Sequence, residues 1–175
     1  MSHIAFLLHN HFEQSEYDEV KNKLEQKGHQ TTLITTNDSK QVQAMQGDVD
    51  KSQTFTADLF AKDADIVSYD ALVLPGGTVN SDTLRHNDVA KQLIKDFYAT
   101  NKPLAAICHA AWALIDTGIA KGKTLTAYQS VKTDLVNAGA TFVDESVQVD
   151  GQIITSRNPN DIDDFVDAID KALTA

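Results

Sequence analysis

Short, nearly unbroken apolar runs alternate with longer amphipathic segments along most of this 175-residue chain. Such runs are typical of strands that are buried on both faces, as in a parallel sheet. The segments between them carry apolar residues at the spacing of a helix. The alternation therefore predicts an α/β fold in one domain, residues 1–175, with a mainly parallel sheet covered by helices on both faces.

The expected elements follow from this pattern. Strands are predicted over residues 3–8, 30–35, 71–74, 103–107 and 124–127. Helices are predicted from Ser15 to the stop signal Gly28, over 87–100, from Trp112 to Gly118, and over 131–138 and 161–173. A hairpin is expected over 147–153, with Asp150-Gly151 as its turn. Residues 37–65 predict only a short strand around Val42 and a strand-and-loop excursion over 48–61.

The charge of the chain excludes some classes of partner. Fifteen Lys and Arg residues against 25 Asp and Glu residues leave a formal charge of −10. Nucleic acid and anionic membranes attract basic surfaces, so neither is an expected partner. No apolar run has the length of a membrane-spanning helix, and the first residues lack the basic start of a signal peptide. With a single cysteine, these features predict a cytoplasmic protein.

The ends of the predicted strands carry the residues with chemical potential. In parallel sheets, ligands bind at the carboxyl ends of the strands. Cys108 stands between an apolar strand and a helix, where helix amides and the helix dipole stabilise a thiolate. Gly76 and Gly77 follow a neighbouring strand, and their backbone amides can approach a substrate oxygen. The plain alternative is a buried structural cysteine beside an ordinary tight turn.

The identity of a general base is left open by the sequence. The chain has six histidines, and none follows His109, so a histidine near the C-terminus cannot serve. Either His109 is the base, or a carboxyl such as Glu16 in the first helical turn tunes the thiol. Burial and a negative sulfur would raise the pKa of that carboxyl, whereas the helix N-terminus would lower it.

No metal and no cofactor are expected. His9 and His11 are two loop histidines without the further ligands that complete a tetrahedral site. The Gly-Gly turn lacks the Gly-Lys-Ser/Thr sequence of a phosphate loop.

Several motifs, in order along nearly the whole chain, resemble the ThiJ/PfpI superfamily, and in particular its PfpI-like intracellular proteases and stress-protein deglycases. These motifs are FEQSE at residues 12–16, ALVLPGG at 71–77, KPLAAICH at 102–109, GKTLT at 122–126, NAGA at 137–140 and TSR at 155–157. The resemblance implies a flavodoxin-like three-layer sandwich of the class I glutamine amidotransferase type. It also implies a homo-oligomer, a dimer or larger.

The same resemblance implies roles for individual residues. Cys108 would be the nucleophile, with His109 and Glu16 beside it, and the amides of Gly77 and His109 would form the oxyanion hole. Asp82 matches an acidic residue that reaches the site of a neighbouring subunit in PfpI-like oligomers. Gly76, Tyr128 and Glu13 are expected to line the pocket; for Tyr128 the expectation comes from a tyrosine near the family's site.

The chain departs from the family pattern in two places. Ala110 and Ala111 stand where the family usually has Gly-Pro, which changes the crowding around the nucleophile and with it the choice of substrate. Asp82 is one methylene shorter than the usual glutamate, which changes its reach toward His109.

Three functions are therefore considered. The first is a cysteine-dependent deglycase or glyoxalase of the stress response, acting on methylglyoxal or on glycated protein or peptide adducts. The second is an intracellular cysteine peptidase or amidase. The third, of another class, is a redox-sensing or holdase-type stress protein in which Cys108 is oxidised.

Overall fold

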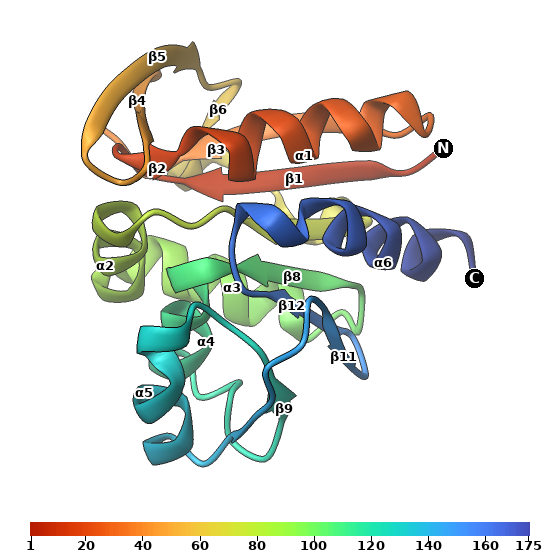
Figure 1. The fold of residues 1–175 in the computed structure, drawn as a ribbon. Helices are drawn as coiled ribbons and strands as arrows, with labels where there is room; N and C mark the ends of the chain where they lie inside the picture. Colours follow the sequence, from red (N-terminus) through yellow and green to blue (C-terminus); the bar gives the residue numbers. More distant parts are fainter.

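A seven-stranded sheet forms the centre of the computed structural model, which describes residues 1–175 (Figure 1). In spatial order its strands are β11 (Gln148–Asp150), β12 (Ile153–Ser156), β8 (Leu104–Ile107), β7 (Ala71–Leu74), β1 (His3–Leu8), β3 (Gln30–Thr35) and β6 (Leu59–Phe60). All neighbouring pairs are parallel except β11 with β12. The chain moves outward from β1 to β3 and β6, then returns to β7 on the other side of β1. The order thus reverses between β1 and β7, where such sheets bind their ligands.

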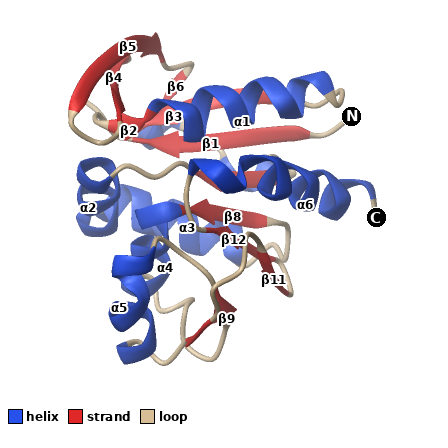
Figure 2. Cartoon of the chain, in the orientation of Figure 1, coloured by secondary structure: helices blue, strands red, loops and turns tan.

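Helices cover both faces of this sheet, giving three layers (Figure 2). One face packs against α1 (Gln14–Gln26) and α6 (Ile162–Thr174), through a core that includes Phe6 and Phe165. The other face packs against α2 (Thr78–His86), α3 (Asp88–Tyr98), α4 (Trp112–Asp116) and α5 (Lys132–Asn137). The predicted α/β sandwich with a mainly parallel sheet is confirmed.

Two small sheets extend this sandwich. A parallel pair joins β9 (Thr124–Leu125) to β10 (Thr141–Phe142). A second sheet joins β2 (Phe12–Glu13) to the hairpin of β4 (Gln41–Gln46) and β5 (Asp50–Thr56). The hairpin is the excursion expected within residues 37–65, and it arches over the start of α1 in Figure 1.

Several local expectations are corrected by the structure. Helix α1 begins at Gln14 after Glu13, and no Ser15 side chain caps it. The β11–β12 turn is Gly151-Gln152, because Asp150 pairs with Ile153 in the ladder. The expected strand over 124–127 is shorter and lies outside the main sheet. Helix α2 was not predicted at all. No helix of the structure combines the length and apolar character needed to cross a bilayer.

Candidate active site

Cys108 is the first residue after β8, the neighbour of β7, which borders the reversal point of the sheet. Its backbone has φ 64°, a left-handed conformation that a residue with a side chain rarely adopts. The 3-10 turn Cys108–Ala111 follows and leads directly into α4. The backbone amides of His109 and Gly77 hydrogen-bond the sulfur and act to lower the pKa of the thiol. The side chain is therefore aimed at two backbone donors, as a nucleophile beside an oxyanion hole requires.

Glu16 reaches the same point from the first turn of α1. It is fully buried, and its Oε1 accepts a hydrogen bond from the Gly76 amide at 3.0 Å. Its Oε2 has no partner at hydrogen-bond distance. Burial, together with the nearby charge of Glu13, raises the pKa of Glu16 to about 8. The carboxyl is therefore mostly protonated at neutral pH, and it lies beside the thiol.

Cys108 and Glu16 titrate as a coupled pair. Burial raises the pKa of the Cys108 thiol above its usual range, and a negative charge on Glu16 raises it further. Protonation of Glu16 removes that repulsion, so a thiolate is best tolerated while the carboxyl keeps its proton. The singly charged pair is then either a thiolate beside a carboxylic acid or a thiol beside a carboxylate.

His109 contacts the sulfur directly. Its Nδ1 lies 3.2 Å from Cys108 Sγ, and its Nε2 lies 3.4 Å from Ser130 Oγ. The imidazole stacks on Tyr128 with ring centroids 4.6 Å apart and meets the edge of Trp112. Burial lowers the pKa of His109, so the ring is neutral at pH 7 and able to accept a proton. Ser130 and Trp112 were not singled out by sequence reasoning.

The Gly76-Gly77 turn brings these groups together. A Cβ on Gly76 would lie 2.3 Å from Glu16 Oε1 and 2.8 Å from Cys108 Cβ, so only glycine fits. Gly77 has φ 90° and packs against the backbone of Glu13. Asn80, fully buried in α2, donates to the carbonyls of Pro75 and Gly76 and holds the turn. No sequence signal marked Asn80, which lies in a segment of polar composition.

Glu13 borders the site through its backbone, but its carboxylate faces the β4–β5 hairpin. It accepts hydrogen bonds from Gly47 N at 3.1 Å and from Asp48 N at 3.0 Å. The Asp48 carboxylate in turn accepts from the backbone amide of Thr78 at 2.8 Å and from its hydroxyl. Asp48 was also missed, because its partners lie 30 and 35 residues away in the sequence.

Asp82 is the one expected catalytic residue that a single chain does not bring to the thiol. It is exposed on α2, in a groove with Thr83, Arg85, His86 and Asp116. Its position on the surface leaves the expectation of a role in a neighbouring subunit as a proposal.

The loop histidines have structural contacts. His9 Nδ1 lies 3.1 Å from Thr36 Oγ1, and the His11 amide donates to the Gln43 carbonyl. No group of three or more His, Cys, Asp or Glu side chains is arranged to hold a metal ion.

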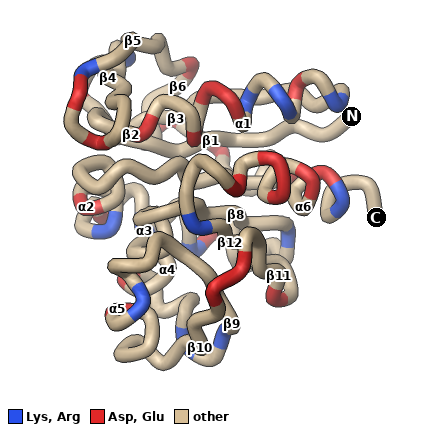
Figure 3. Tube along the Cα trace, viewed as in Figure 1, with Lys and Arg blue, Asp and Glu red and all other residues tan.

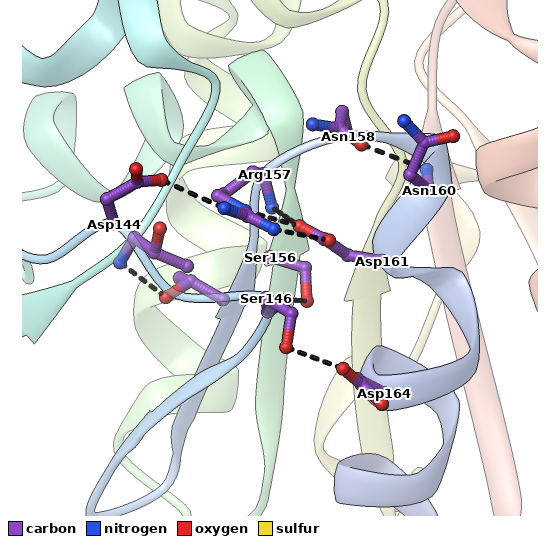
Figure 4. A network of polar contacts seen from close by, with 10 residues as sticks. Asp144, Ser146, Ser156, Arg157, Asn158, Asn160, Asp161 and Asp164 are labelled. Atoms are coloured by element: carbon purple, nitrogen blue, oxygen red, sulfur yellow. Dashed lines mark hydrogen bonds and ion pairs between the residues drawn. The ribbon is translucent and has the colours of Figure 1, made fainter.

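A polar network surrounds Arg157, just after β12 (Figure 4). Arg157 binds Asp161 through two nitrogens and Asp144 through a third, all at 2.9 Å. These bonds tie the end of β12 to the start of α6. Between this network and Tyr128 lies an open groove of about 610 Å³, which continues outward from Ser130 and His109.

Comparisons with known proteins agree with this geometry. The family model described as "DJ-1/PfpI family" matches residues 2–172. The chain belongs to the DJ-1/PfpI family. The resemblance inferred from the motifs is thereby confirmed, and so is the flavodoxin-like fold that it implied.

Three DJ-1/PfpI relatives illustrate the range of similarity. The chain is 41% identical over 172 residues to "Uncharacterized protein SAV1875" of Staphylococcus aureus, covering 97% of both proteins. It is 38% identical over 162 residues to "Putative cysteine protease YraA" of Bacillus subtilis, covering 93% of this chain and 92% of that one. A two-domain crystal structure from Anabaena variabilis, with DJ-1/ThiJ/PfpI-like and ferritin-like domains, superposes with a TM-score of 0.91 at 29% identity. It covers 99% of this chain, which spans 48% of that protein.

Proposed function

We propose that this DJ-1/PfpI protein is a cysteine-dependent enzyme of the stress response that converts methylglyoxal, free or as a glycation adduct, to lactate. One observation carries the proposal: the Cys108 sulfur lies between two backbone amides, beside a buried carboxyl whose second oxygen has no partner. Both a nucleophile and a proton carrier are thus within reach of one small carbonyl compound. Family membership is consistent with a cysteine hydrolase in general terms.

The proposed chemistry begins with the thiolate adding to the aldehyde carbon of methylglyoxal. The new carbon–sulfur bond gives a hemithioacetal, whose oxygen is stabilised by the amides of Gly77 and His109. A proton then leaves the former aldehyde carbon and another is delivered to the neighbouring carbon. This internal redox step oxidises the aldehyde to a thioester and reduces the ketone to an alcohol. Water cleaves the thioester, releasing lactate and the thiol, so no external oxidant or reductant is needed.

Two side chains are suited to move these protons. A general acid or base works best when its pKa is near the working pH, and the pKa of Glu16 is raised to about 8. His109 is neutral and lies 3.2 Å from the sulfur, so it is placed to take the thiol proton. In a glycated adduct the same attack on the former aldehyde carbon expels the amine or guanidine nitrogen, which requires one further proton.

Peptide or amide hydrolysis is the second candidate, favoured by the similarity to the protein named "Putative cysteine protease YraA". That reaction needs an imidazole that is oriented by a carboxylate as in a catalytic triad. Within one chain, His109 Nε2 faces the Ser130 hydroxyl instead. Asp82 of a second subunit would have to supply the acid, so the peptidase proposal also requires a homo-oligomer.

The test is the product of methylglyoxal turnover by the wild type and by Cys108→Ser. The proposal expects lactate, identified by NMR, from the wild type alone. Ser130→Ala is a second variant that leaves the nucleophile and Glu16 in place, and it should retain measurable turnover. Circular dichroism and thermal melting should show that the variants are folded.

Other outcomes point to the alternatives. Cleavage of fluorogenic peptides without lactate formation would replace the proposal by the peptidase. Absence of both activities, together with a Cys108 mass increase of two oxygens in peroxide, would replace it by the redox sensor.

A further inference from the structure

The tip of the β4–β5 hairpin, which belongs to a separate sheet, lies beside the Gly76-Gly77 turn of the site, where Asp48 contacts Thr78. The tip residues Gly47 and Asp48 are held from below by Glu13, whose two carboxylate oxygens accept their amides. Asp48 has φ 71°, so the chain turns sharply there and presents the side chain to α2. The tip is therefore a fixed part of the site and not a free loop end.

The Asp48 carboxylate lies directly beside the oxyanion hole. It binds the amide and hydroxyl of Thr78, the residue that follows Gly77. The Gly77 amide is one of the two donors to the Cys108 sulfur. A carboxylate is thus held one residue away from the Gly77 amide, which would donate a hydrogen bond to a substrate oxygen.

The carboxyls of this region form no ion pairs. None of the nine ion pairs of the structure involves Glu13, Glu16 or Asp48. The charge of Asp48 is felt by the reacting groups themselves, because it raises the pKa of both Cys108 and Glu16. Acidic residues, red in Figure 3, lie on the hairpin and along α1, and basic residues, blue, also lie on the hairpin.

The groove that leads away from the tip is also lined by acidic residues. It has a volume of about 900 Å³ and runs along α1 from Glu13 and Gly47 toward Pro159. Its lining has no large hydrophobic side chain and includes the acidic residues Asp18 and Glu19. Its one cationic residue, Lys23, is already paired with Asp163 at 2.9 Å. This groove thus offers an incoming anion no unpaired counter-charge.

We propose that Asp48 determines specificity by charge: the site accepts neutral or cationic carbonyl compounds and rejects carboxylate-bearing ones. The restriction to carbonyl compounds rests on the proposed function, but the selection by charge applies to any reagent that reaches Cys108. Methylglyoxal and adducts on lysine or arginine side chains fall in the accepted class, and glyoxylate falls in the rejected class. Asp48 would be a specificity residue and not a catalytic one.

The charge selection is tested without turnover, by alkylating Cys108 with neutral iodoacetamide and with anionic iodoacetate. Both reagents react with the thiolate, so the ratio of their rate constants cancels changes in thiolate population. The ratio is the rate constant for iodoacetamide divided by that for iodoacetate, and it is normalised to the same ratio for the neutral thiol N-acetylcysteinamide. This normalised ratio should exceed one in the wild type. In Asp48→Asn, which keeps an acceptor for the Thr78 amide, it should fall by about threefold to tenfold at low ionic strength.

A matched control shows whether the effect depends on the position of the lost charge or only on the loss of one negative charge. Asp50→Asn removes the same charge from an exposed position on the same hairpin and should leave the normalised ratio near the wild-type value. If Asp48→Asn does not fold, Asp48→Gly replaces it, because glycine suits the φ of 71° at this position, and it should show the same fall in the ratio. Added NaCl should also reduce the wild-type ratio toward that of the free thiol. An unchanged ratio in Asp48→Asn, an equal fall in Asp50→Asn, or a salt-independent wild-type ratio would overturn the inference.

The substrate side is tested in parallel with methylglyoxal and glyoxylate. Asp48→Asn should raise the relative kcat/KM for glyoxylate by a similar factor. If neither compound is turned over while the alkylation ratio behaves as expected, the proposed function fails and the charge selection stands. If lactate forms but the alkylation ratio does not respond to Asp48, the proposed function stands and the selection fails.

Discussion

The buried Glu16 makes the stability of this protein fall as the pH rises. Its pKa is raised from 4.5 to about 8 in the folded chain, so the folded state holds a proton that the unfolded state releases between these values. Stability decreases with pH wherever the folded state binds more protons. The contribution is therefore complete below pH 4.5 and is lost progressively up to pH 8. Integrating the two titrations between pH 5 and pH 8 gives a loss of about 3–4 kcal/mol.

Glu16→Gln should remove this dependence, because an amide resembles the protonated carboxyl in shape and carries no charge. Unfolding by guanidinium chloride, measured at pH 5 and pH 8, gives the free energy of unfolding of both proteins. At each pH, the free energy of unfolding of the wild type is subtracted from that of Glu16→Gln. The difference at pH 5 is then subtracted from the difference at pH 8. The resulting double difference should favour the glutamine variant by about 3–4 kcal/mol.

Glu19→Gln, an exposed change in the same helix, serves as the control and should give a value within about 0.5 kcal/mol of zero. A double difference below about 1 kcal/mol for Glu16→Gln would refute the reasoning. It would mean that Glu16 is ionised in the folded protein at neutral pH, and that its role as proton donor to the site is wrong.

Two further predictions concern the packing of the site and its assembly. Gly76→Ala places a Cβ within 2.3 Å of Glu16 Oε1 and 2.8 Å of the Ile107 carbonyl. This substitution should lower the free energy of unfolding by about 1–3 kcal/mol. Iodoacetamide should then modify Cys108 at a changed rate. An alanine variant as stable as the wild type would contradict the close packing around Gly76. If Asp82 completes a partner's site, specific activity should fall on dilution to the monomer, and Asp82→Asn should show the lower activity at every concentration; equal activity in a monomer shown by sedimentation would exclude that role.

The central sheet could be predicted because its strands are defined by local composition. The runs that form β1 and β7 are mostly apolar, and the run that forms β3 is rich in β-branched residues. The predicted bounds of all three agree with the structure. Cys108 and Gly76-Gly77 were placed together because parallel strands end at a common edge. Family resemblance then supplied the expectation that Glu16 touches the thiol.

The parts that escaped prediction depend on contacts between distant segments. Helix α2 has the sequence TVNSDTLRH, whose polar residues suggest a loop. Its first amide is capped by Asp48 and its buried face uses Asn80 to bind backbone carbonyls, so its stability comes from partners elsewhere in the chain. Ser130 likewise meets His109 only because the segment after β9 folds back over the nucleophile turn. No pattern within a short window of sequence carries that information.

The hairpin of β4 and β5 lies outside the main sheet, and this separation bears on how the family can diversify. The reacting groups are attached to β1, β7 and β8, and Gly76 leaves no free space among them. The hairpin is joined to the rest of the site through β2, through contacts of Glu13 and His11, and through the bond from the Thr78 amide to Asp48. Substitutions or length changes in the hairpin can therefore alter which molecules are admitted while the nucleophile stays in register. The reacting groups and the residues that select the substrate thus belong to different segments of one chain.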